Sequence, residues 1–426
     1  MNEKKRWSLR SIIQFLILGI AGGLIYTVIY MKSGYYEGFV QAFSISDADY
    51  GKLFTIYSVT TIVTYFLGGV ITDRFSVRKL LCISYVGTGA LQLYFATFPS
   101  YRVVILLYIA MGITTTATYW CTFIKAQREL GQRVGAEAKV YGGIEAVRGF
   151  ANSIFSTIAA FLYMGAATLV IGLRYAIMLY GATLVVAGIL VLVFFRESDS
   201  EIVDDSGSET KVPLMKQILE CIKIPGVWYS VFIIGGLYTL MQCFYDFMSV
   251  LTTEKFMIDA GLSAMISNIQ FYVNPIGAIV GGIFLDKVGN KNVNKIIAVS
   301  VCVLIAITGI TIAMPASANM AIPFIVLFCL FVFASGIARC GQWLTLSNSG
   351  VPMWLAGTAT GVVSTFAYIP NGAYSTIAGY IMEAKGRLAG IEIVYASLMV
   401  FGVLAVVFCV VLEKHRKKHI DTIQAA

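Results

Sequence analysis

The sequence predicts an all-α membrane protein, in which twelve transmembrane helices form two parallel six-helix repeats around a central cavity. Three observations lead to this fold class. The 426 residues are 58% hydrophobic and 13% charged, with a mean hydropathy of +0.80, which is too apolar for a soluble globular domain. Apolar runs of at least 19 residues occur twelve times, and each can cross a hydrocarbon core of about 30 Å as a helix. Finally, the second half of the chain repeats features of the first.

The twelve apolar runs are read as helices because they do not alternate and are rich in small residues, whereas a barrel needs alternating segments of about ten residues. In the first half we place the spans at 11–31, 49–71, 80–98, 102–124, 140–165 and 172–195. In the second half we place them at 228–251, 262–285, 294–314, 320–344, 356–382 and 391–412.

The positive charges set the orientation. With the N-terminus in the cytoplasm, 21 of the 31 Lys and Arg residues fall on the cytoplasmic side and 7 on the other, so both termini are expected in the cytoplasm. The net charge of +8 then reflects topology and acidic lipid headgroups rather than nucleic-acid binding. The eight cysteines are scattered, and both histidines lie in the C-terminal tail, so neither a metal nor a cofactor is expected.

The internal repeat has a spacing of 213 residues. Three residues of a motif after the second span recur after the eighth, where Gly69, Asp73 and Arg74 correspond to Gly282, Asp286 and Lys287. A Gly-Gly-Leu sequence that begins at Gly22 recurs at the same spacing at Gly235. Six helices return the chain to its starting side, so the repeat is parallel, about an axis normal to the membrane.

The repeat predicts three parts of the chain. Residues 1–195 form an N-terminal six-helix bundle, residues 196–225 a cytoplasmic linker, and residues 226–426 a C-terminal six-helix bundle with its tail. The linker is rich in acidic residues and contains the sequence DSGS, which is typical of flexible segments. Its last part, PLMKQILECIKI, is amphipathic and is expected on the membrane surface.

The topology and the two motif copies, G-x-x-x-D-R-x-x-x-R-K and G-x-x-x-D-K-x-G-N-K, resemble the major facilitator superfamily (MFS) of secondary transporters. The region GGLIYTVIYMKSGYYEGF is most similar to its organophosphate:phosphate antiporter branch and to uncharacterised enterobacterial permeases of the YihN type. The resemblance implies a multi-pass protein of the bacterial inner membrane. That branch carries an Arg-Lys pair late in span one, where this chain has Met31 and Lys32. An anionic or polar organic substrate is therefore expected, without a specific indication of phosphate esters.

The resemblance also implies that the motif copies act in gating, by latching the cytoplasmic side of the two halves. The residues concerned are Gly69, Asp73, Arg74, Arg78, Gly282, Asp286 and Lys287. The alternative is that the basic residues only hold the loops in the cytoplasm, as topology signals do. Such signals need no acidic residue, which favours the latch for Asp73 and Asp286.

Ionisable residues at membrane depth are candidates for function. Span five carries Glu145 and Arg148 one turn apart, on one polar stripe with Asn152 and Ser156. Arg148 could anchor an anionic substrate, with Glu145 as its orienting partner or as a proton carrier. Equally, the two could form an ion pair that only holds span five to a neighbour.

Two further cations occupy nearly equivalent positions in the repeat. Lys125 continues a threonine face in span four, and Arg339 shares a face with Ser335 and Gln342 in span ten. Arg339 is a substrate-binding candidate. Both residues lie near the cytoplasmic ends of their spans, so they could instead extend their charged ends toward the lipid headgroups.

Spans one, seven and eleven supply the remaining candidates. For substrate binding these are Tyr26, Tyr30, Lys32, Gln242 and Asn371, and for ion coupling Asp246 joins Glu145. The repeat places Lys32 and Asp246 where they could face each other across the cavity, as a gate or a clamp on the substrate. The alternative is that the tyrosines and Lys32 are interfacial anchors.

The function that best fits these features is secondary active transport of a small polar, anionic organic solute such as a sugar acid, sulfonate, carboxylate or phosphate ester. Alternating access would be driven by a proton gradient or by solute exchange, with the bilayer, the solute and protons or a counter-solute as partners of a monomer. A solute sensor and a drug/proton antiporter remain alternatives. A membrane enzyme is not expected, because no span contains a histidine.

Overall fold

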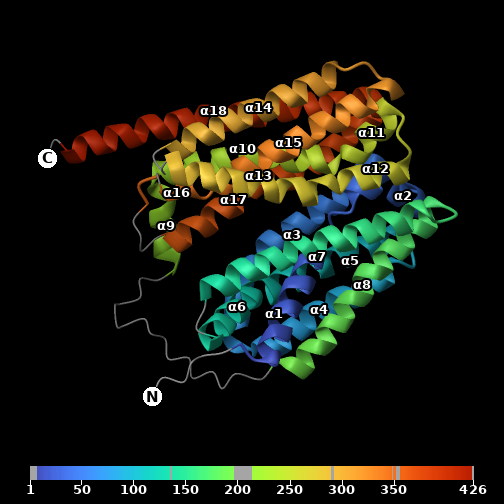
Figure 1. Cartoon of the computed structure of the whole chain (residues 1–426), viewed down its shortest axis with the longest axis horizontal. Helices are drawn as coiled ribbons and strands as arrows, with labels where there is room; N and C mark the ends of the chain where they lie inside the picture. The colour runs from blue at the N-terminus through green and yellow to red at the C-terminus, as the bar shows by residue number, and fades with distance from the viewer. Residues whose placement is uncertain are drawn as a thin grey trace. The chain divides into compact units, whose positions relative to one another are not determined.

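The computed structural model describes residues 7–134, 137–195, 214–288, 292–347, 349–351 and 356–424, and its regular elements there are helices (Figure 1). The chain divides into two compact units. Unit 1 consists of Met1–Val203 with Asp259–Asn268, and unit 2 consists of Asp204–Ile258 with Ile269–Ala426. The expected all-α fold class is therefore confirmed.

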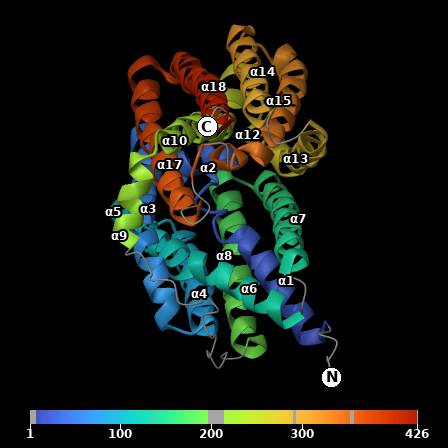
Figure 2. The same cartoon turned by 90° about the vertical axis from the view of Figure 1, so that its left-hand side faces the viewer.

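Unit 1 is built from pairs of long helices. Its elements are α1 (Leu9–Leu24), α2 (Lys32–Phe43), α3 (Asp47–Arg74), α4 (Val77–Phe95), α5 (Tyr101–Thr115), the π-helix η1 (Thr116–Trp120), α6 (Cys121–Val134), α7 (Glu137–Met164), α8 (Leu169–Phe194) and α12 (Ala260–Ser267). Helix α4 packs along α8, α1 along α7, and α3 along α5 and η1. Figure 2 shows α1 and α7 side by side. The short α12 packs on α2 and α7.

Unit 2 has the same helix-on-helix construction. Its elements are α9 (Leu214–Lys223), α10 (Pro225–Asp246), α11 (Met248–Phe256), α13 (Ile269–Val288), α14 (Val293–Ala313), the 3₁₀ turn η3 (Ala318–Met320), α15 (Ala321–Gly341), α16 (Leu344–Ser347), α17 (Ala356–Lys385) and α18 (Arg387–Gln424). Helix α13 packs on α15, α10 on α17 and α18, and α14 on α18. The amphipathic segment of the linker forms α9, which packs on α17.

Within the described residues, seven helices are long and apolar enough to cross a membrane by length and composition. They are Tyr101–Gly131, Leu169–Phe194, Pro225–Asp246, Ala260–Leu285, Val293–Ala313, Ala318–Gly341 and Arg387–Lys418. Four further predicted spans correspond to α3, α4, α7 and α17, which have 28, 19, 28 and 30 residues. These four are long enough to span but contain more polar and small residues.

The first predicted span, 11–31, is not one helix. Helix α1 ends at Leu24, and the next residues form tight turns in which the Thr27 amide donates to the Leu24 carbonyl at 3.0 Å. The physical reason lies in the Gly22 carbonyl. A continuing α-helix would pair this carbonyl with the Tyr26 amide, but it accepts from the Arg148 side chain instead, at 3.2 Å.

The seventh predicted span, 228–251, is also broken, at Phe247, and this break shares its backbone geometry with a second kink of the first unit, at Tyr35. Tyr35 (φ −118°, ψ 23°) leaves the helical region inside α2, and Phe247 (φ −105°, ψ 12°) does so between α10 and α11. Helices α2 and α11 then end on left-handed residues, Ser44 (φ 48°) and Met257 (φ 54°). The first pair is 212 residues apart and the second 213, so the sequence repeat is also a repeat of backbone conformation.

Candidate functional site

The predicted pair of Glu145 and Arg148 is formed in unit 1. The Arg148 guanidinium contacts the Glu145 carboxylate at 2.5 Å, and the Arg148 and Glu145 side chains are 20% and 59% exposed. A second guanidinium nitrogen donates to the Gly22 carbonyl, and the group lies 5.2 Å from the centre of the Phe123 ring. Arg148 therefore caps the C-terminal end of α1, where carbonyls lack helical partners and a positive charge is favourable.

The glycine pair of α1 allows this arrangement. A Cβ atom on Gly23 would lie 2.6 Å from the Arg148 carbonyl oxygen, so α1 and α7 touch through their backbones. In unit 2, a Cβ atom on Gly235 would lie 3.0 Å from the Ala367 carbonyl oxygen, where α10 meets α17. The sequence repeat aligns Ala367 with Arg148. The close packing is thus common to both units, whereas the charge is present in unit 1 alone.

The rest of the polar stripe on α7 is engaged in contacts within unit 1. The Asn152 side-chain oxygen lies 3.5 Å from the Thr27 hydroxyl and 3.3 Å from the Ser156 hydroxyl, both of which can donate to it. The Tyr180 hydroxyl donates to Ser156 at 3.3 Å, and the Asn268 amide donates to the Ser156 carbonyl at 2.8 Å. These bonds join α7 to α8 and to the end of α12. The uncharged part of the stripe, Asn152 and Ser156, therefore holds helices together.

The candidates in the broken segment after α1 lie among aromatic rings. Tyr26 donates its hydroxyl proton to the Thr115 carbonyl at 3.0 Å. The Tyr30 ring packs edge-on against Phe54, with centroids 5.2 Å apart. Lys32 is only 3% exposed, and its amine lies 4.0 Å from the centre of the same Phe54 ring. A buried amine over an aromatic face is a cation–π arrangement, and it is unlike an interfacial anchor that reaches toward water.

A ladder of hydroxyl groups surrounds the π-helix η1, which the sequence did not indicate. The Tyr57 and Thr115 hydroxyls lie 3.0 Å apart, and Thr64 contacts Thr116. About two turns further along α3, the Thr72 and Thr122 hydroxyls are 3.0 Å apart. These bonds join α3 to α5, to η1 and to α6. π-Bulges occur frequently at functional sites, and in this one Tyr26 binds the carbonyl of the residue that precedes the bulge.

The unit 2 candidates lie around α10. The Gln242 amide donates to the Asp246 carboxylate at 3.0 Å, and Asp246 is fully buried. The same turn of α10 carries Cys243, whose thiol lies 3.1 Å from the side-chain oxygen of Asn371 on α17. Gln242, Asp246 and Asn371 are thus brought to one region of unit 2. Whether Asp246 faces Lys32 involves both units and stays a prediction.

Arg339 is placed differently from the other membrane-depth cations. Its guanidinium is exposed at the end of α15 and takes part in no hydrogen bond or ion pair with the residues that the structure describes. It lies within electrostatic range of the phenols of Tyr238, Tyr245 and Tyr368. The Tyr238 and Tyr368 rings are in contact, with centroids 4.5 Å apart. Its repeat equivalent, Lys125, donates to the Thr72 carbonyl at 3.2 Å.

The gating motifs are described in part. The side chains of Asp73, Arg74 and Asp286 lie outside the described residues, as does the packing of Gly69, so their latch role stays a prediction. Arg78 donates to the Leu192 carbonyl near the end of α8, which a helix C-terminus favours.

Close packing in the two motif copies lies one residue earlier than the aligned glycines. A Cβ atom on Gly282 would meet nothing within 4 Å, whereas one on Gly281 would lie 2.7 Å from the Cys340 sulfur. In the first copy, a Cβ atom on Gly68 would similarly lie 2.9 Å from the Thr116 carbonyl oxygen. The side chain of Lys287 is exposed.

Sequence reasoning missed a buried ion pair in unit 2. Lys255 on α11 is fully buried, and its amine donates to the Glu392 carboxylate and to the Ile312 carbonyl, each at 2.6 Å. The neighbouring Glu254 pairs with Arg387 at 3.6 Å. Two ion pairs thus fasten α11, the second part of the broken helix, to the start of α18. The predicted span ended at residue 251, so neither α11 charge was counted at membrane depth.

Unit 1 has a related contact, in which the cation meets a carbonyl and an aromatic ring but no carboxylate among the described residues. Arg174 donates to the Ala96 carbonyl at 3.1 Å and stacks over Phe98 at 5.1 Å. Ala96 and Ile312 each lie three residues before a proline of the repeat, Pro99 and Pro315. In both units a cation therefore binds the last carbonyls of the helix that precedes this turn, but it comes from a different helix in each.

A family model and two named relatives match most of this chain. The family model described as Major Facilitator Superfamily matches residues 12–375. Inner membrane protein YqcE of Escherichia coli (strain K12) is 26% identical over 375 residues, which is 87% of this chain and 86% of that protein. Inner membrane protein YihN of the same organism is 23% identical over 438 aligned residues, covering 100% of both.

Solved structures with the same fold are transporters. A mutant of the nucleoside transporter NupG superposes with a TM-score of 0.74 at 13% identity, covering 95% of this chain and 99% of that one. A D-xylose–proton symporter gives a TM-score of 0.70 at 14% identity, covering 95% of this chain and 96% of that one. At such identities the likeness shows the fold, and the family match shows the membership. The chain belongs to the Major Facilitator Superfamily and is a multi-pass membrane transporter of that family.

Proposed function

We propose that this protein is a secondary active transporter of a small polar, anionic organic solute such as a sugar acid, sulfonate, carboxylate or phosphate ester. The family supplies the transport function, and alternating access about a midplane site is its expected mechanism. The observation that carries the anionic preference is the environment of Arg339. A guanidinium offers five donors in a planar fork that matches carboxylate, sulfonate and phosphate groups.

The other two candidates, Arg148 and Lys125, already make polar contacts within their own unit. Arg148 caps the end of α1 and pairs with Glu145. Lys125 donates to the Thr72 carbonyl. Arg339 has no such contact among the described residues. It is therefore proposed as the main anion anchor, while Arg148 contributes its remaining N–H donors.

Neutral groups would hold the rest of the solute. The phenols of Tyr238 and Tyr368 lie within electrostatic range of Arg339, and Gln242 and Asn371 add amide groups on α10 and α17. Tyr30 and Lys32 are proposed to contribute from the broken helix of unit 1. Tyr26 would act through the backbone, because its hydroxyl already holds the Thr115 carbonyl.

For coupling to protons, Asp246 is the better of the two proposed carboxylates. It is fully buried at membrane depth, and Gln242 donates to it. An ionisable side chain within a span marks an ion or substrate pathway. Glu145 is 59% exposed and neutralised by Arg148. Exchange of one solute for another is the alternative driving force.

The remaining features of the proposal concern architecture. Residues 1–195 and 226–426 would move as two six-helix halves joined by the 196–225 linker, with the motif around Asp73 and Asp286 closing the cytoplasmic side. The relatives named as inner membrane proteins support the same location here, and the distribution of Lys and Arg supports cytoplasmic termini.

A ligand screen followed by transport tests the proposal. Purified protein is first screened by thermal shift against sugar acids, sulfonates, carboxylates and phosphate esters, with neutral sugars and nucleosides in parallel. Compounds that stabilise it are then tested for counterflow in proteoliposomes, with and without a pH gradient. We expect stabilisation by one anionic class and counterflow of the same class. Stabilisation only by neutral compounds would overturn the anionic preference, and stabilisation without counterflow would indicate a solute sensor.

Variants test the anchor itself. Arg339→Gln should abolish the ligand-induced stabilisation, and Arg339→Lys should retain part of it, because the charge remains but the fork is lost. The matched control is Lys295→Gln, which removes an exposed cation near the start of α14. Equal ligand affinity in all three variants would exclude Arg339 as the anchor.

A further inference from the structure

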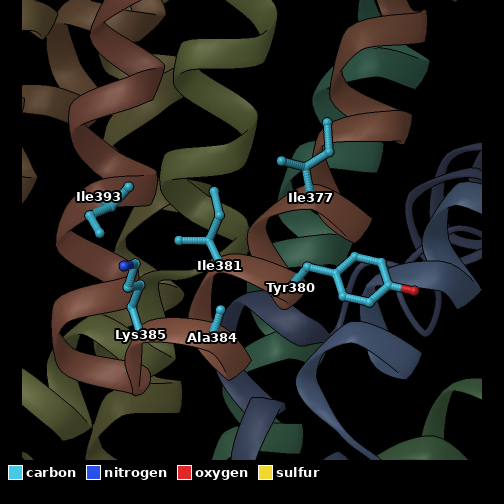
Figure 3. A pocket seen from close by; sticks show the side chains of 6 residues that line it. All are labelled: Ile377, Tyr380, Ile381, Ala384, Lys385 and Ile393. Carbon is cyan, nitrogen blue, oxygen red and sulfur yellow. The ribbon is translucent and has the colours of Figure 1, made fainter.

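An apolar groove lies where helices α17 and α18 meet, at the turn that joins them. It has a volume of about 360 Å³ and is lined by Ile377, Tyr380, Ile381, Ala384, Lys385 and Ile393. Figure 3 shows Ile381 and Lys385 of α17 turned toward Ile393 of α18, while the Tyr380 ring points away from it. Ile377 and Ile393 are 50% and 43% exposed. None of these residues belongs to the proposed solute site.

The lining changes from apolar to cationic along the helix axis. Ile377, Ile381 and Lys385 are spaced four residues apart, so they form one stripe on α17 that rises about 12 Å. Lys385 is the last residue of α17, and Gly386 (φ 80°) ends the helix there. The stripe therefore runs from the apolar depth of a span to a positive charge at its end. Tyr380, half exposed on the adjacent face, is of the type found at membrane–water interfaces.

Other charged residues around this turn pair with one another, so the Lys385 amine is available to bind an anion. Arg387 pairs with Glu254, and Lys255 pairs with Glu392. Within the described residues, Lys385 makes no hydrogen bond or ion pair. The acidic Glu383 lies two positions away, which is about 200° around the helix and hence on the opposite face. An anion could approach Lys385 along the groove without meeting an acidic side chain of α17.

We propose that this groove binds a glycerophospholipid with an anionic headgroup, with an acyl chain along Ile377, Ile381 and Ile393 and the phosphate at Lys385. The order of the lining matches the order of a lipid from chain to headgroup. A cation near the membrane surface attracts anionic lipids, and a long side chain at a helix end can direct its amine to the headgroup level. The apolar wall provides the contact that a free phosphate ion would lack.

Native mass spectrometry of the full-length protein in detergent tests this site. The protein is titrated with phosphatidylglycerol and, separately, with phosphatidylethanolamine. Lys385→Gln should weaken phosphatidylglycerol binding about fivefold, the effect expected from one lysine near a lipid surface. It should weaken phosphatidylethanolamine binding less, because the ammonium of that headgroup offsets the charge of its phosphate. The matched control, Lys414→Gln, removes an exposed cation at the other end of α18 and should change neither lipid.

The apolar part is tested with Ile377→Ser, which should weaken both lipids. Because Ile377 is half exposed, this variant is expected to keep the elution volume and unfolding temperature of the unaltered protein. Equal losses in Lys385→Gln and Lys414→Gln would mean general charge attraction and overturn the site. Unchanged binding of both lipids by Ile377→Ser would also overturn the site. So would a lipid-free dimer of the unaltered protein that Ile377→Ser dissociates, because the groove would then be an interface between two copies of the chain.

Discussion

The buried pair of Lys255 and Glu392 leads to a prediction about which partner is more costly to lose. Lys255 is fully enclosed, whereas the Glu392 side chain is 36% exposed. Glu392→Met leaves a buried ammonium with the Ile312 carbonyl as its acceptor, and Lys255→Met leaves a carboxylate that water can reach. Since an unpaired charge is costly in proportion to its burial, the glutamate substitution should be the more damaging of the two.

The magnitudes follow from the exposure of the charge that remains. Removing one partner of a buried ion pair costs about 3–5 kcal/mol, and we expect Glu392→Met to lie in this range. For Lys255→Met the remaining charge is partly hydrated, so about 1.5–3 kcal/mol is expected, the scale of hydrogen bonds to a charged group. The double variant replaces both charges by apolar groups and should lie within about 1 kcal/mol of the unaltered protein.

The assay is the apparent unfolding temperature of detergent-purified protein at one fixed scan rate, because such transitions are often irreversible. At about 2 °C per kcal/mol for a large chain, Glu392→Met should lower it by about 6–10 °C and Lys255→Met by about 3–6 °C. Lys295→Met, at an exposed position, serves as the control and should change little. A double variant whose loss equals the sum of the single losses would refute the reasoning, because the two charges would then be uncoupled.

Two further predictions concern the backbone. Gly23→Ala should lower the unfolding free energy by about 1–3 kcal/mol, because its Cβ atom would lie 2.6 Å from the Arg148 carbonyl oxygen. Gly149→Ala, where a Cβ atom meets nothing within 4 Å, should instead be neutral or stabilise by about 0.5–1 kcal/mol. Equal unfolding temperatures for the two alanine variants would contradict the close approach of α1 and α7. At the left-handed residues Ser44 and Met257, substitution by glycine should raise the free energy of unfolding by up to about 1 kcal/mol. The unfolding temperature should therefore rise slightly. A decrease at both positions would argue against these conformations.

The sequence was sufficient for those features that depend on composition and on local spacing. Long apolar runs identify helices whatever their neighbours are, and a shared offset identifies the repeat. The pair of Glu145 and Arg148 could be predicted because residues three apart lie on one face of a helix. Its partner, the Gly22 carbonyl, could not, since it lies 126 residues earlier in the chain.

Features that depend on tertiary contacts were beyond sequence reasoning. Lys255 and Glu392 are 137 residues apart, and nothing local indicates that they meet. The break after Leu24 was also missed, because hydropathy measures how apolar a segment is and does not distinguish an α-helix from tighter turns. Similarly, the threonines near Thr116 suggest a polar face, but only the backbone shows that the helix widens there into a π-helix.

The matched breaks at Tyr35 and Phe247 also bear on the history of the protein. If the two halves descend from one duplicated sequence, a feature present in both was already present before the duplication. The kink at Tyr35 and Phe247 would then be ancestral, whereas Arg148 and the pair of Lys255 and Glu392, each found in one half alone, would have been acquired or lost afterwards. On this view the bend is the older inheritance, and the charges record how each half later specialised.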